Sequence, residues 1–279
     1  MQIGCIIQAR TTSTRLPKKV LKTIDYVRKR TILEEVIRRV KLSKKIDKIV
    51  IATTKNKSDD DIVNISQKEG IGWFRGSEND VLSRYFFAAK ENRFDHIVRI
   101  TSDCPFIDPY VIDNLIELYI EGEYDYASNC ILRTFPHGLD CEIFSFEGLK
   151  YIYENAVKSS HREHVTSFFY ENKDKFKIGE LALKEEDYSN IRITVDTKED
   201  YLLACIIQDY LSEGQEAFSN IVRLFKEKPY LKEINSNILQ KKIYDTVTDE
   251  IRAAINVLKL QEMERAAQLL EKYNNGDDR

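Results

Sequence analysis

The chain has 279 residues, and its 43 basic and 46 acidic side chains leave a formal net charge of −3. This balance excludes a broadly basic surface, so the charge gives no reason to expect nucleic acid as a partner. Hydrophobic residues make up 42% of the sequence and charged residues 32%, as in an ordinary globular protein. The length predicts one substantial domain, or one domain with an appendage.

The amino terminus and the cysteines bear on the compartment. Residues 1–10 contain a short apolar run with no basic segment before it, so we predict no signal peptide. Without a stretch of about 18 apolar residues, no membrane span is predicted. The five cysteines lack C-x-x-C spacing, and their odd number argues against a disulfide framework or a zinc site. We therefore expect a cytoplasmic protein with reduced thiols.

Strands and helices alternate in the amino-terminal part of the chain. Short apolar runs predict buried strands at residues 2–8, 48–53 and 96–101. Helices are predicted from Ile32 to Val40, over residues 58–69 with Ser58 as the N-cap, and over residues 79–92. This alternation predicts an α/β fold with a mostly parallel sheet flanked by helices. Ligands of such sheets bind beyond the carboxyl ends of the strands.

The pattern changes beyond residue 124. Strands are predicted at residues 124–128, 141–146, 176–183 and 191–197, the last of which ends in an aspartate. Helices are predicted near residues 146–157, 161–172, 198–212 and 217–227. From about residue 244 to residue 272 the sequence predicts a charged, amphipathic helix that packs on its own domain or on a dimer partner. We expect one main domain over residues 1–242 and a helical extension over residues 243–279.

The loop after the first predicted strand is rich in hydroxyl groups and cations. Between Arg10 and Lys19 it has four Ser or Thr residues and four basic residues. Backbone N–H groups, hydroxyls and cations are the groups that bind a triphosphate. The loop has no glycine and does not match the P-loop pattern. A solvated basic turn is the simpler interpretation of an isolated loop of this kind, but the position after a buried strand favours nucleotide binding.

Two aspartates follow predicted buried strands, Asp103 in TSDCP and Asp196 in TVDTKED. Mg²⁺ takes oxygen ligands, usually one or two carboxylates together with substrate phosphates. Either aspartate alone would more commonly cap a helix or a turn. Beside the basic loop, the two together make a magnesium site a competing interpretation.

The histidines give a weaker signal. His161 and His164 lie three residues apart on a predicted helix, a spacing that could bind a metal. Because no third ligand is evident, a position on the helix surface or a substrate contact is favoured. The sequence shows no Ser-His-Asp or Cys-His signature.

Several segments in order along the chain resemble the CMP-sugar cytidylyltransferases that act on KDO and acylneuraminate sugars. The segments are IIQARTTSTRLPKKVL, RGSENDVLSRY, RITSDCPFIDPYVID, FPHGLDCEIFSFEGL, HREHVTSFFYEN and ITVDTKEDY. The sequence is most similar to the branch of spore coat polysaccharide biosynthesis protein F. The resemblance implies a Rossmann-like, GT-A-type nucleotidyltransferase fold. It also implies a reaction in which a sugar oxygen attacks the α-phosphate of CTP and releases pyrophosphate, with Mg²⁺ as cofactor.

The resemblance further implies the roles of individual residues. The nucleotide ligands would be Ala9, Arg10, Ser13, Arg15, Lys18 and Lys19, and the catalytic residues Arg10, Arg15, Lys19 and Asp103. Asp103 and Asp196 would hold Mg²⁺. The acceptor would lie near Gly138, Asp140, Glu142, His161, Glu163 and His164. Lys18 stands where the KDO branch has a glycine, which leaves open whether Lys18 or Lys19 meets the phosphates.

Other readings remain open for the acceptor and for the reaction. Asn129 and Arg133 could meet a carboxylate, and equally a phosphonate on a non-sugar acceptor. Another nucleoside triphosphate could be used. A GT-A glycosyltransferase is a further alternative, but its D-x-D motif is available only at Asp59–Asp61, which is not at a clear strand end. A non-catalytic scaffold is disfavoured because it would not need the loop cations and both aspartates. Partners would be CTP and a small acidic acceptor, and a homodimer is a candidate assembly.

Overall fold

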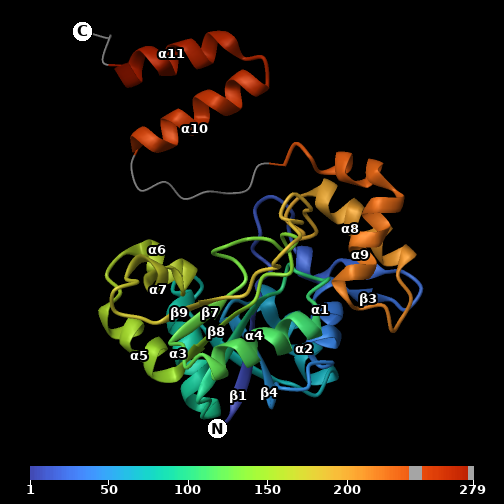
Figure 1. Cartoon of the computed structure of the whole chain (residues 1–279), viewed down its shortest axis with the longest axis vertical. Helices are drawn as coiled ribbons and strands as arrows, with labels where there is room; N and C mark the ends of the chain where they lie inside the picture. Colours follow the sequence, from blue (N-terminus) through green and yellow to red (C-terminus); the bar gives the residue numbers. More distant parts are fainter. Residues whose placement is uncertain (239–246, 276–279) are drawn as a thin grey trace. The chain divides into compact units, whose positions relative to one another are not determined.

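The computed structural model describes residues 1–238 and 247–275, and the chain divides into two units, Met1–Asn237 and Ile238–Arg279 (Figure 1). The expected boundary between residues 242 and 243 lies outside the described residues. Among the helices of the described ranges, none combines the length and the apolar character that a membrane crossing demands.

A seven-stranded sheet forms the centre of the first unit. Its strand order is β5-β4-β1-β6-β8-β7-β9. The strands are β1 (Ile3–Gln8), β4 (Lys48–Thr54), β5 (Gly72–Gly76), β6 (His96–Thr101), β7 (Tyr126–Ser128), β8 (Glu142–Ser145) and β9 (Ile178–Glu180). The pairs β5–β4, β4–β1, β1–β6 and β7–β9 are parallel, whereas β8 is antiparallel to both β6 and β7. The predicted mostly parallel sheet is confirmed.

Helices cover both faces of this sheet, as the alternation of strands and helices predicts (Figure 1). Cys5 and Ile7 of β1 pack on one face with α1 (Ile32–Val40), α2 (Asp60–Lys68) and α4 (Pro109–Glu121). Ile6 points to the other face, which is covered by α3 (Val81–Asn92), α5 (Phe146–Asn155) and α7 (Ser167–Glu171). A strand buried on both sides is apolar on both faces, which is why residues 3–7 of β1 form a continuous apolar run.

A third hydrophobic cluster joins loops that lie far apart in the sequence. Leu16 from the loop after β1, Leu139, and Val195 are all buried in it. Their partners come from α8 (Lys198–Tyr210), α9 (Phe218–Glu227) and the region of the two-stranded hairpin β2–β3 (Thr23–Asp25 and Arg30–Thr31). This cluster fixes the positions of the polar residues that flank the three buried side chains.

Three local predictions were wrong. Residues 191–197 do not form a sheet strand but an extended segment with one isolated bridge, between His137 and Arg192. The predicted helix over residues 161–172 is divided into α6 (Ser159–His164) and α7 at Val165, whose φ is 64°. Ser58 is not an N-cap, because a 3₁₀ turn at Lys57–Asp59 precedes α2.

Strand β5 and helix α4 have no counterpart in the sequence-based prediction, and neither do the short strands β2 and β3. Strand β5 is short and contains glycine at both ends, which weakens the strand signal. Helix α4 has a strong start signal, since the Asp108 side chain accepts from the N–H groups of Tyr110 and Val111 and Pro109 is the first helical residue.

The second unit contains a helical hairpin instead of the expected single helix. Helices α10 (Val247–Leu260) and α11 (Glu264–Asn275) are separated by a turn in which Glu262 has a φ of 58°. Ile255 and Ala267 are its buried side chains. The apolar stripe that predicted one long helix instead packs two shorter helices together. Residues 244–246 of the predicted helix lie outside the described residues.

Candidate active site

The Lys19 ammonium lies between the carboxylates of Asp103 and Asp196. Its Nζ donates to Asp103 Oδ2 at 2.8 Å and to Asp196 Oδ1 at 2.7 Å. Lys19 begins the 3₁₀ turn Lys19–Leu21, Asp103 follows β6, and Asp196 follows the extended segment 191–195. The N–H of Val195 donates to the Asp103 carbonyl at 2.8 Å, which holds the two aspartate segments side by side. Residues 177 positions apart thus meet at one point.

The charges of this cluster stabilise one another. Burial alone would raise the pKa of Asp103, but the charge and the hydrogen bond of Lys19 outweigh it and lower that pKa. Burial would likewise lower the pKa of Lys19, but Asp103 and Asp196 reverse this effect and raise it. At neutral pH Asp103 is therefore ionised and Lys19 carries its positive charge. Lys19 itself is nearly buried, with 11% of its side chain exposed.

The two carboxylates fit a divalent cation. Asp103 Oδ2 and Asp196 Oδ1 both contact the same atom, Lys19 Nζ, so these two oxygens lie close together. About a quarter of each carboxylate is exposed, which leaves room for a cation and a substrate oxygen on the open side. Two carboxylates completed by substrate phosphates are the usual protein ligands of Mg²⁺. The described residues contain no cluster of three or more His, Cys, Asp or Glu that could hold a metal alone.

The remaining cations of the loop after β1 are more exposed than Lys19. Arg15 Nη2 lies 3.0 Å from Asp196 Oδ2, and 39% of its side chain is exposed. Arg10 is 43% exposed, and its Nη1 lies 4.0 Å from Glu78 Oε1. Lys18 is exposed and has a φ of 54°, a left-handed conformation that glycine adopts more easily. Lys19 is thus the lysine turned toward the aspartates, while Lys18 forms the turn. Ala9 is buried at the start of the loop, and Ser13 is partly exposed within it.

Two carboxylates, the buried Asp59 and the partly exposed Glu78, anchor this loop to its neighbours. Asp59 is fully buried and accepts from the backbone N–H of Thr11 at 2.8 Å and from its hydroxyl at 2.6 Å. Thr54 at the end of β4 also donates to Asp59. Glu78 accepts from Thr12 and from Asn56, at 2.6 and 2.7 Å. Sequence reasoning missed these two residues, because an aspartate in an acidic helix start and a glutamate in a polar loop give no distinctive signal.

The segment proposed for the acceptor contains a chain of paired charges. Arg133 Nη1 donates to Asp140 Oδ1 at 2.5 Å, and His137 Nε2 lies 3.5 Å from Asp140 Oδ2. Burial lowers the pKa of His137, although the nearby Asp140 acts in the opposite direction. About a fifth of each of these three side chains is exposed. They can therefore both pair with one another and contact a ligand.

Gly138 allows this segment to approach the segment that carries Asp196. Its φ is +116°, and an added Cβ would lie 2.6 Å from the backbone nitrogen of Thr194. The two segments exchange backbone hydrogen bonds through His137, which donates to Ile191 O and accepts from Ile193 N, both at 2.8 Å. Only glycine fits both the backbone conformation and the space.

Three of the residues proposed for the acceptor are turned into the protein. Glu142 is 5% exposed and accepts from Tyr126 and Thr166 as well as from Arg99. Asn129 is 1% exposed, and its amide bonds the backbone of Leu139 and Cys141. His161 is buried with its Nε2 2.9 Å from Glu171. These contacts bond all three side chains to the protein, and a contact of any of them with an acceptor stays a prediction. On the same helix as His161, Glu163 is exposed and His164 is partly buried.

Arg192 connects the acceptor segment to Asp196, and sequence reasoning missed it. Its Nη2 lies 3.1 Å from Asp196 Oδ2, and its Nη1 lies 3.1 Å from His137 Nδ1. Its Nε and Nη2 also donate to both oxygens of Asp200, at 2.9 and 2.8 Å. A single charged side chain within the apolar run IRITV was the available signal, but the segment was predicted only as a strand, and Arg192 was given no role.

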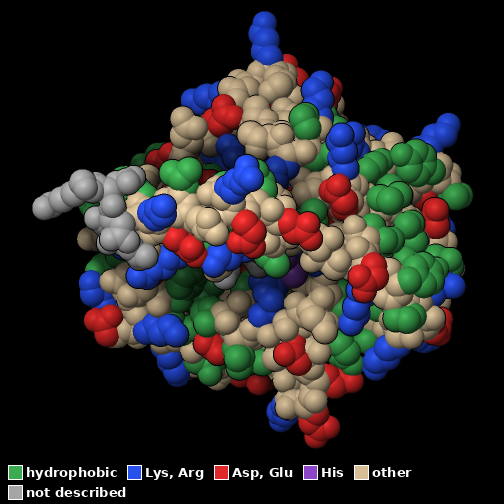
Figure 2. All heavy atoms as spheres, turned by 90° about the horizontal axis from the view of Figure 1, so that it is seen from above, with side chains coloured by type: hydrophobic (Ala, Val, Ile, Leu, Met, Phe, Trp, Pro, Cys, Tyr) green, Lys and Arg blue, Asp and Glu red, His purple; other side chains and the backbone are tan. Residues whose placement is uncertain are grey.

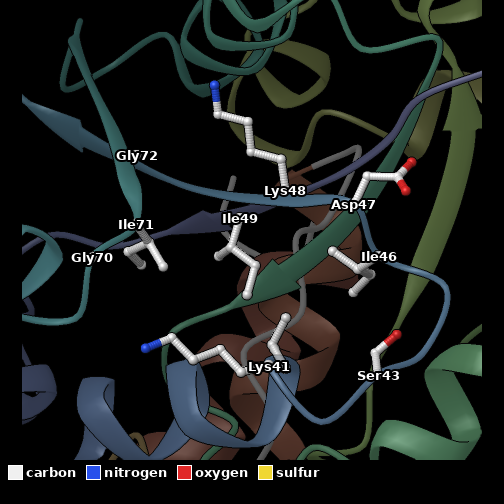
Figure 3. A pocket seen from close by; sticks show the side chains of 10 residues that line it. Lys41, Ser43, Ile46, Asp47, Lys48, Ile49, Gly70, Ile71 and Gly72 are labelled. Atoms are coloured by element: carbon white, nitrogen blue, oxygen red, sulfur yellow. The ribbon is translucent and has the colours of Figure 1, made fainter.

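A pocket of about 330 Å³ lies at the opposite edge of the sheet, beside the first residues of β4 and β5. Figure 3 shows its apolar wall, in which Ile49, Ile71 and Ile46 face the same hollow. Polar groups around it already have partners, since Ser43 donates to Asp113 and Asp47 accepts from the N–H of Ile3. This pocket is therefore a weaker candidate for the active site than the charged cluster at the carboxyl edge. Figure 2 shows no single sign of charge over the face that it draws, and acidic and basic side chains are interspersed there.

Known proteins resemble this chain over most of its length. A family model described as cytidylyltransferase matches residues 4–246. An uncharacterised protein of Methanocaldococcus jannaschii is 40% identical over 246 residues, covering 86% of this chain and 97% of that protein. Spore coat polysaccharide biosynthesis protein SpsF of Bacillus subtilis is 34% identical over 231 residues, covering 80% and 94%. A solved cytidylyltransferase structure from Leptospira borgpetersenii has a TM-score of 0.79 and 35% identity, covering 88% of this chain and 99% of that one.

Proposed function

The chain belongs to the cytidylyltransferase family, and from this premise we propose that it transfers CMP from CTP to an acidic sugar and releases pyrophosphate. Membership makes the chain a nucleotidyltransferase with the Rossmann-like fold of that family. The proposal adds the acceptor class, a nonulosonic acid or a KDO-like acid, and a role in the synthesis of surface polysaccharide or glycan.

One observation carries the proposal. The cation-rich loop after β1 and two aspartates from distant segments converge on one point, with Lys19 bonded to both carboxylates. A triphosphate with its metal ion requires this combination, because cations must face the phosphate oxygens while carboxylates face the metal. A scaffold that bound neither would have no use for a half-buried cluster of opposed charges at the sheet edge where ligands bind.

In this proposal the loop cations bind the triphosphate. Arg10 and Arg15 are exposed enough to reach β- and γ-phosphate oxygens, and both can do so bidentately. Lys19 lies where it can neutralise charge as the phosphate bond breaks. Losing one such preorganised cation commonly costs a hundredfold or so in rate.

Asp103 and Asp196 are the proposed ligands of Mg²⁺. When bound, Mg²⁺ would stabilise negative charge at the α-phosphate and lower the pKa of the attacking acceptor oxygen. The chain's own contribution is to hold the two carboxylates close together, which Lys19, Arg15 and Arg192 accomplish through their contacts.

The acceptor segment supports an acidic substrate. Arg133 and His137 flank Asp140, and all three keep part of their surface exposed beside the Asp196 segment. A guanidinium at this place can bind a carboxylate bidentately once it leaves Asp140. A phosphonate offers the same oxygen pattern, so it is the second acceptor class that we propose to test.

The direct test is incubation with CTP, Mg²⁺ and a panel of nonulosonic acids, KDO and phosphonates, followed by mass spectrometry. We expect a CMP conjugate of one acidic sugar together with pyrophosphate. Conjugates formed only with phosphonates would replace the acceptor class, and nucleotide left intact with every acceptor would contradict the proposal.

A second test addresses the nucleotide. Thermal shift with each of the four nucleoside triphosphates and Mg²⁺ should show the largest stabilisation with CTP, because a ligand stabilises the state that it binds. A GT-A glycosyltransferase would instead bind a nucleotide sugar through a D-x-D motif. The carboxylate of Asp59 in the segment Asp59–Asp61 is fully engaged with Thr11 and Thr54, which disfavours that alternative.

The proposal also includes a cytoplasmic, homodimeric enzyme. All five cysteines are free thiols, in keeping with a reducing compartment. The hairpin α10–α11 leaves Leu260, Met263 and Leu269 at least half exposed, which would suit packing against a second copy. Light scattering in solution would give the mass of the assembly, and a monomer would remove this part of the proposal.

A further inference from the structure

We infer that Arg192 is a positioning residue that ties the metal-binding carboxylate Asp196 to the acceptor segment through His137. The inference deepens the proposed function and rests on it for the acceptor, but the contacts that carry it stand on the geometry alone. The side chain of Arg192 bonds Asp196, His137 and Asp200. It would therefore act on the metal and on the acceptor through these neighbours.

The guanidinium of Arg192 contacts three side chains at once. Arg192 is 12% exposed and uses all three of its nitrogens. Its Nη2 contacts Asp196 Oδ2 at 3.1 Å, Nη1 contacts His137 Nδ1 at 3.1 Å, and Nε contacts Asp200 Oδ1 at 2.9 Å. A planar group with donors in fixed directions sets the relative positions of the groups that accept from it.

Neighbouring residues hold Arg192 in place. Asp200 is buried at the start of α8 and caps it, with Asp196 N and Thr197 N both donating to its Oδ2. Asn235 Nδ2 donates to Asp200 Oδ1 at 2.9 Å and to the backbone carbonyl of Arg192 at 3.1 Å. Asp200 therefore holds the guanidinium in place, and the guanidinium in turn orients Asp196 and His137.

The contact with Arg192 fixes the state of His137. Because a guanidinium has only donors, His137 Nδ1 must accept from Arg192, and the proton of the neutral ring lies on Nε2. That N–H faces Asp140 Oδ2 at 3.5 Å, and Asp140 in turn accepts from Arg133. Arg192 thus selects the tautomer that presents a donor on the acceptor side.

A chain of contacts consequently runs from Asp103 through Lys19, Asp196, Arg192 and His137 to Asp140. Partners that orient a metal ligand from behind typically change metal affinity or activity 10- to 100-fold when they are removed, by a general rule for such groups. Arg192 differs from an ordinary partner of this kind because the same side chain also orients the acceptor side.

The test compares Arg192→Lys with a matched control. Lysine keeps the charge but loses the fork, so it cannot contact Asp196, Asp200 and His137 together. Arg38→Lys is the control, since Arg38 bridges Glu35 and Glu216, each at 2.8 Å, away from this site. Binding of Mn²⁺ alone, measured by electron paramagnetic resonance, should weaken about tenfold or more in R192K and less than twofold in R38K.

A second variant separates the contact of Arg192 with Asp196 from its contact with His137. His137→Leu removes the hydrogen bond between Arg192 and His137 on the acceptor side, and it leaves the contact between Arg192 and Asp196. We expect H137L to bind Mn²⁺ within twofold of the wild type and to raise the KM for the acceptor, whereas R192K changes both. Nitrogen-15 NMR of the imidazole should show a proton on Nε2 of His137 in the wild type and a mixture of tautomers in R192K.

Each outcome decides the inference. Mn²⁺ affinity and a His137 tautomer in R192K that equal those of the wild type would overturn it, as would equal losses in R192K and R38K. If the wild type forms no CMP conjugate with any acid, the proposed function fails, while the Mn²⁺ and NMR measurements still test Arg192.

Discussion

Two polar segments meet at the carboxyl edge of the sheet, and they handle their charges differently. In the nucleotide segment, residues 9–19, Arg10 and Arg15 are about two-fifths exposed, and Lys19 pairs with carboxylates that would suit a metal ion. In the acceptor segment, residues 129–142, Asn129 and Glu142 are buried and fully bonded to the protein.

The difference shows where each specificity resides. A triphosphate is bound by cations, and their number and place are visible in a sequence. In the proposed function, an acceptor would be bound by the few groups that remain exposed after the segment has satisfied its own hydrogen bonds, here Arg133, His137 and Asp140. Substitutions in the two segments should therefore affect different kinetic constants.

The largest expected effect tests the metal-binding side of this comparison. Asp103→Asn keeps the shape but removes the charge that faces Lys19, so turnover should fall about a hundredfold or more. Pyrophosphate release with saturating CTP and acceptor measures it. Near-normal turnover would show that Asp103 holds no metal.

The control for this variant lies at the other edge of the sheet. Asp113 accepts from Ser43 at 2.5 Å beside the pocket of Figure 3. Asp113→Asn should leave turnover within about twofold of the wild type, because a change far from the reacting atoms removes no stabilisation of the transition state.

The next effect tests the close approach of the acceptor segment. Gly138→Ala would place a Cβ 2.6 Å from Thr194 N, so we expect a loss of about 2–3 kcal/mol in the free energy of unfolding. The KM for the acceptor should also rise, because the displaced backbone carries His137. Urea denaturation and steady-state kinetics provide the two measurements.

Gly70→Ala separates backbone strain from the steric clash. Gly70 also has a positive φ, +66°, but an added Cβ would meet nothing within 4 Å. This variant should lose only about 1 kcal/mol and keep its KM values. Equal losses in the two alanine variants would mean that the approach to Thr194 contributes nothing.

The smallest effect concerns the anchor of the nucleotide segment. Burial would raise the pKa of Asp59, but hydrogen bonds from Thr11 and Thr54 outweigh it and lower that pKa. Asp59→Asn should therefore cost about 1–2 kcal/mol of stability at neutral pH. Since the folded pKa is the lower one, the contribution is complete above the unfolded value of about 3.9 and is lost as the pH falls through the folded value.

The pH series provides the check. Urea denaturation should give a difference between wild type and D59N that is constant from pH 7 to about pH 5 and shrinks below about pH 4. Asp61→Asn on the same helix is the control, because Asp61 is exposed, and should change stability little at any pH. A difference that does not depend on pH would contradict the assignment.

The sequence sufficed for the sheet and for the place of the loop 9–19 at its edge, because local patterns determine them. The apolar runs of β1, β4 and β6 are visible without a structure, and the polar loops after β1 and β6 necessarily lie at the same edge. The contact of Asp196 with Lys19 was predicted only as a common site. It depends on the cluster around Leu16, Leu139 and Val195, which joins three distant segments.

The acceptor segment could not be predicted to the same depth. A motif marks Glu142 and Asn129 as polar residues in a distinctive context, but it does not show whether their polar atoms face the protein or the ligand. Glu142 lies in β8 between two buried residues, and its direction depends on Arg99, Tyr126 and Thr166 across the fold. Arg192 was missed because the partner that connects it to the acceptor segment, His137, lies 55 positions away in the sequence.

Calorimetric titration of CTP into the protein, with Mg²⁺ and then with excess chelator, tests the central claim most directly. If the loop cations and the aspartate pair act on one metal–nucleotide complex, the wild type should bind CTP more tightly than UTP, GTP or ATP, and removing Mg²⁺ should weaken that binding at least about tenfold. The account would be contradicted if the wild type in excess chelator, and the D103N variant with Mg²⁺, each bound CTP as tightly as the wild type with Mg²⁺.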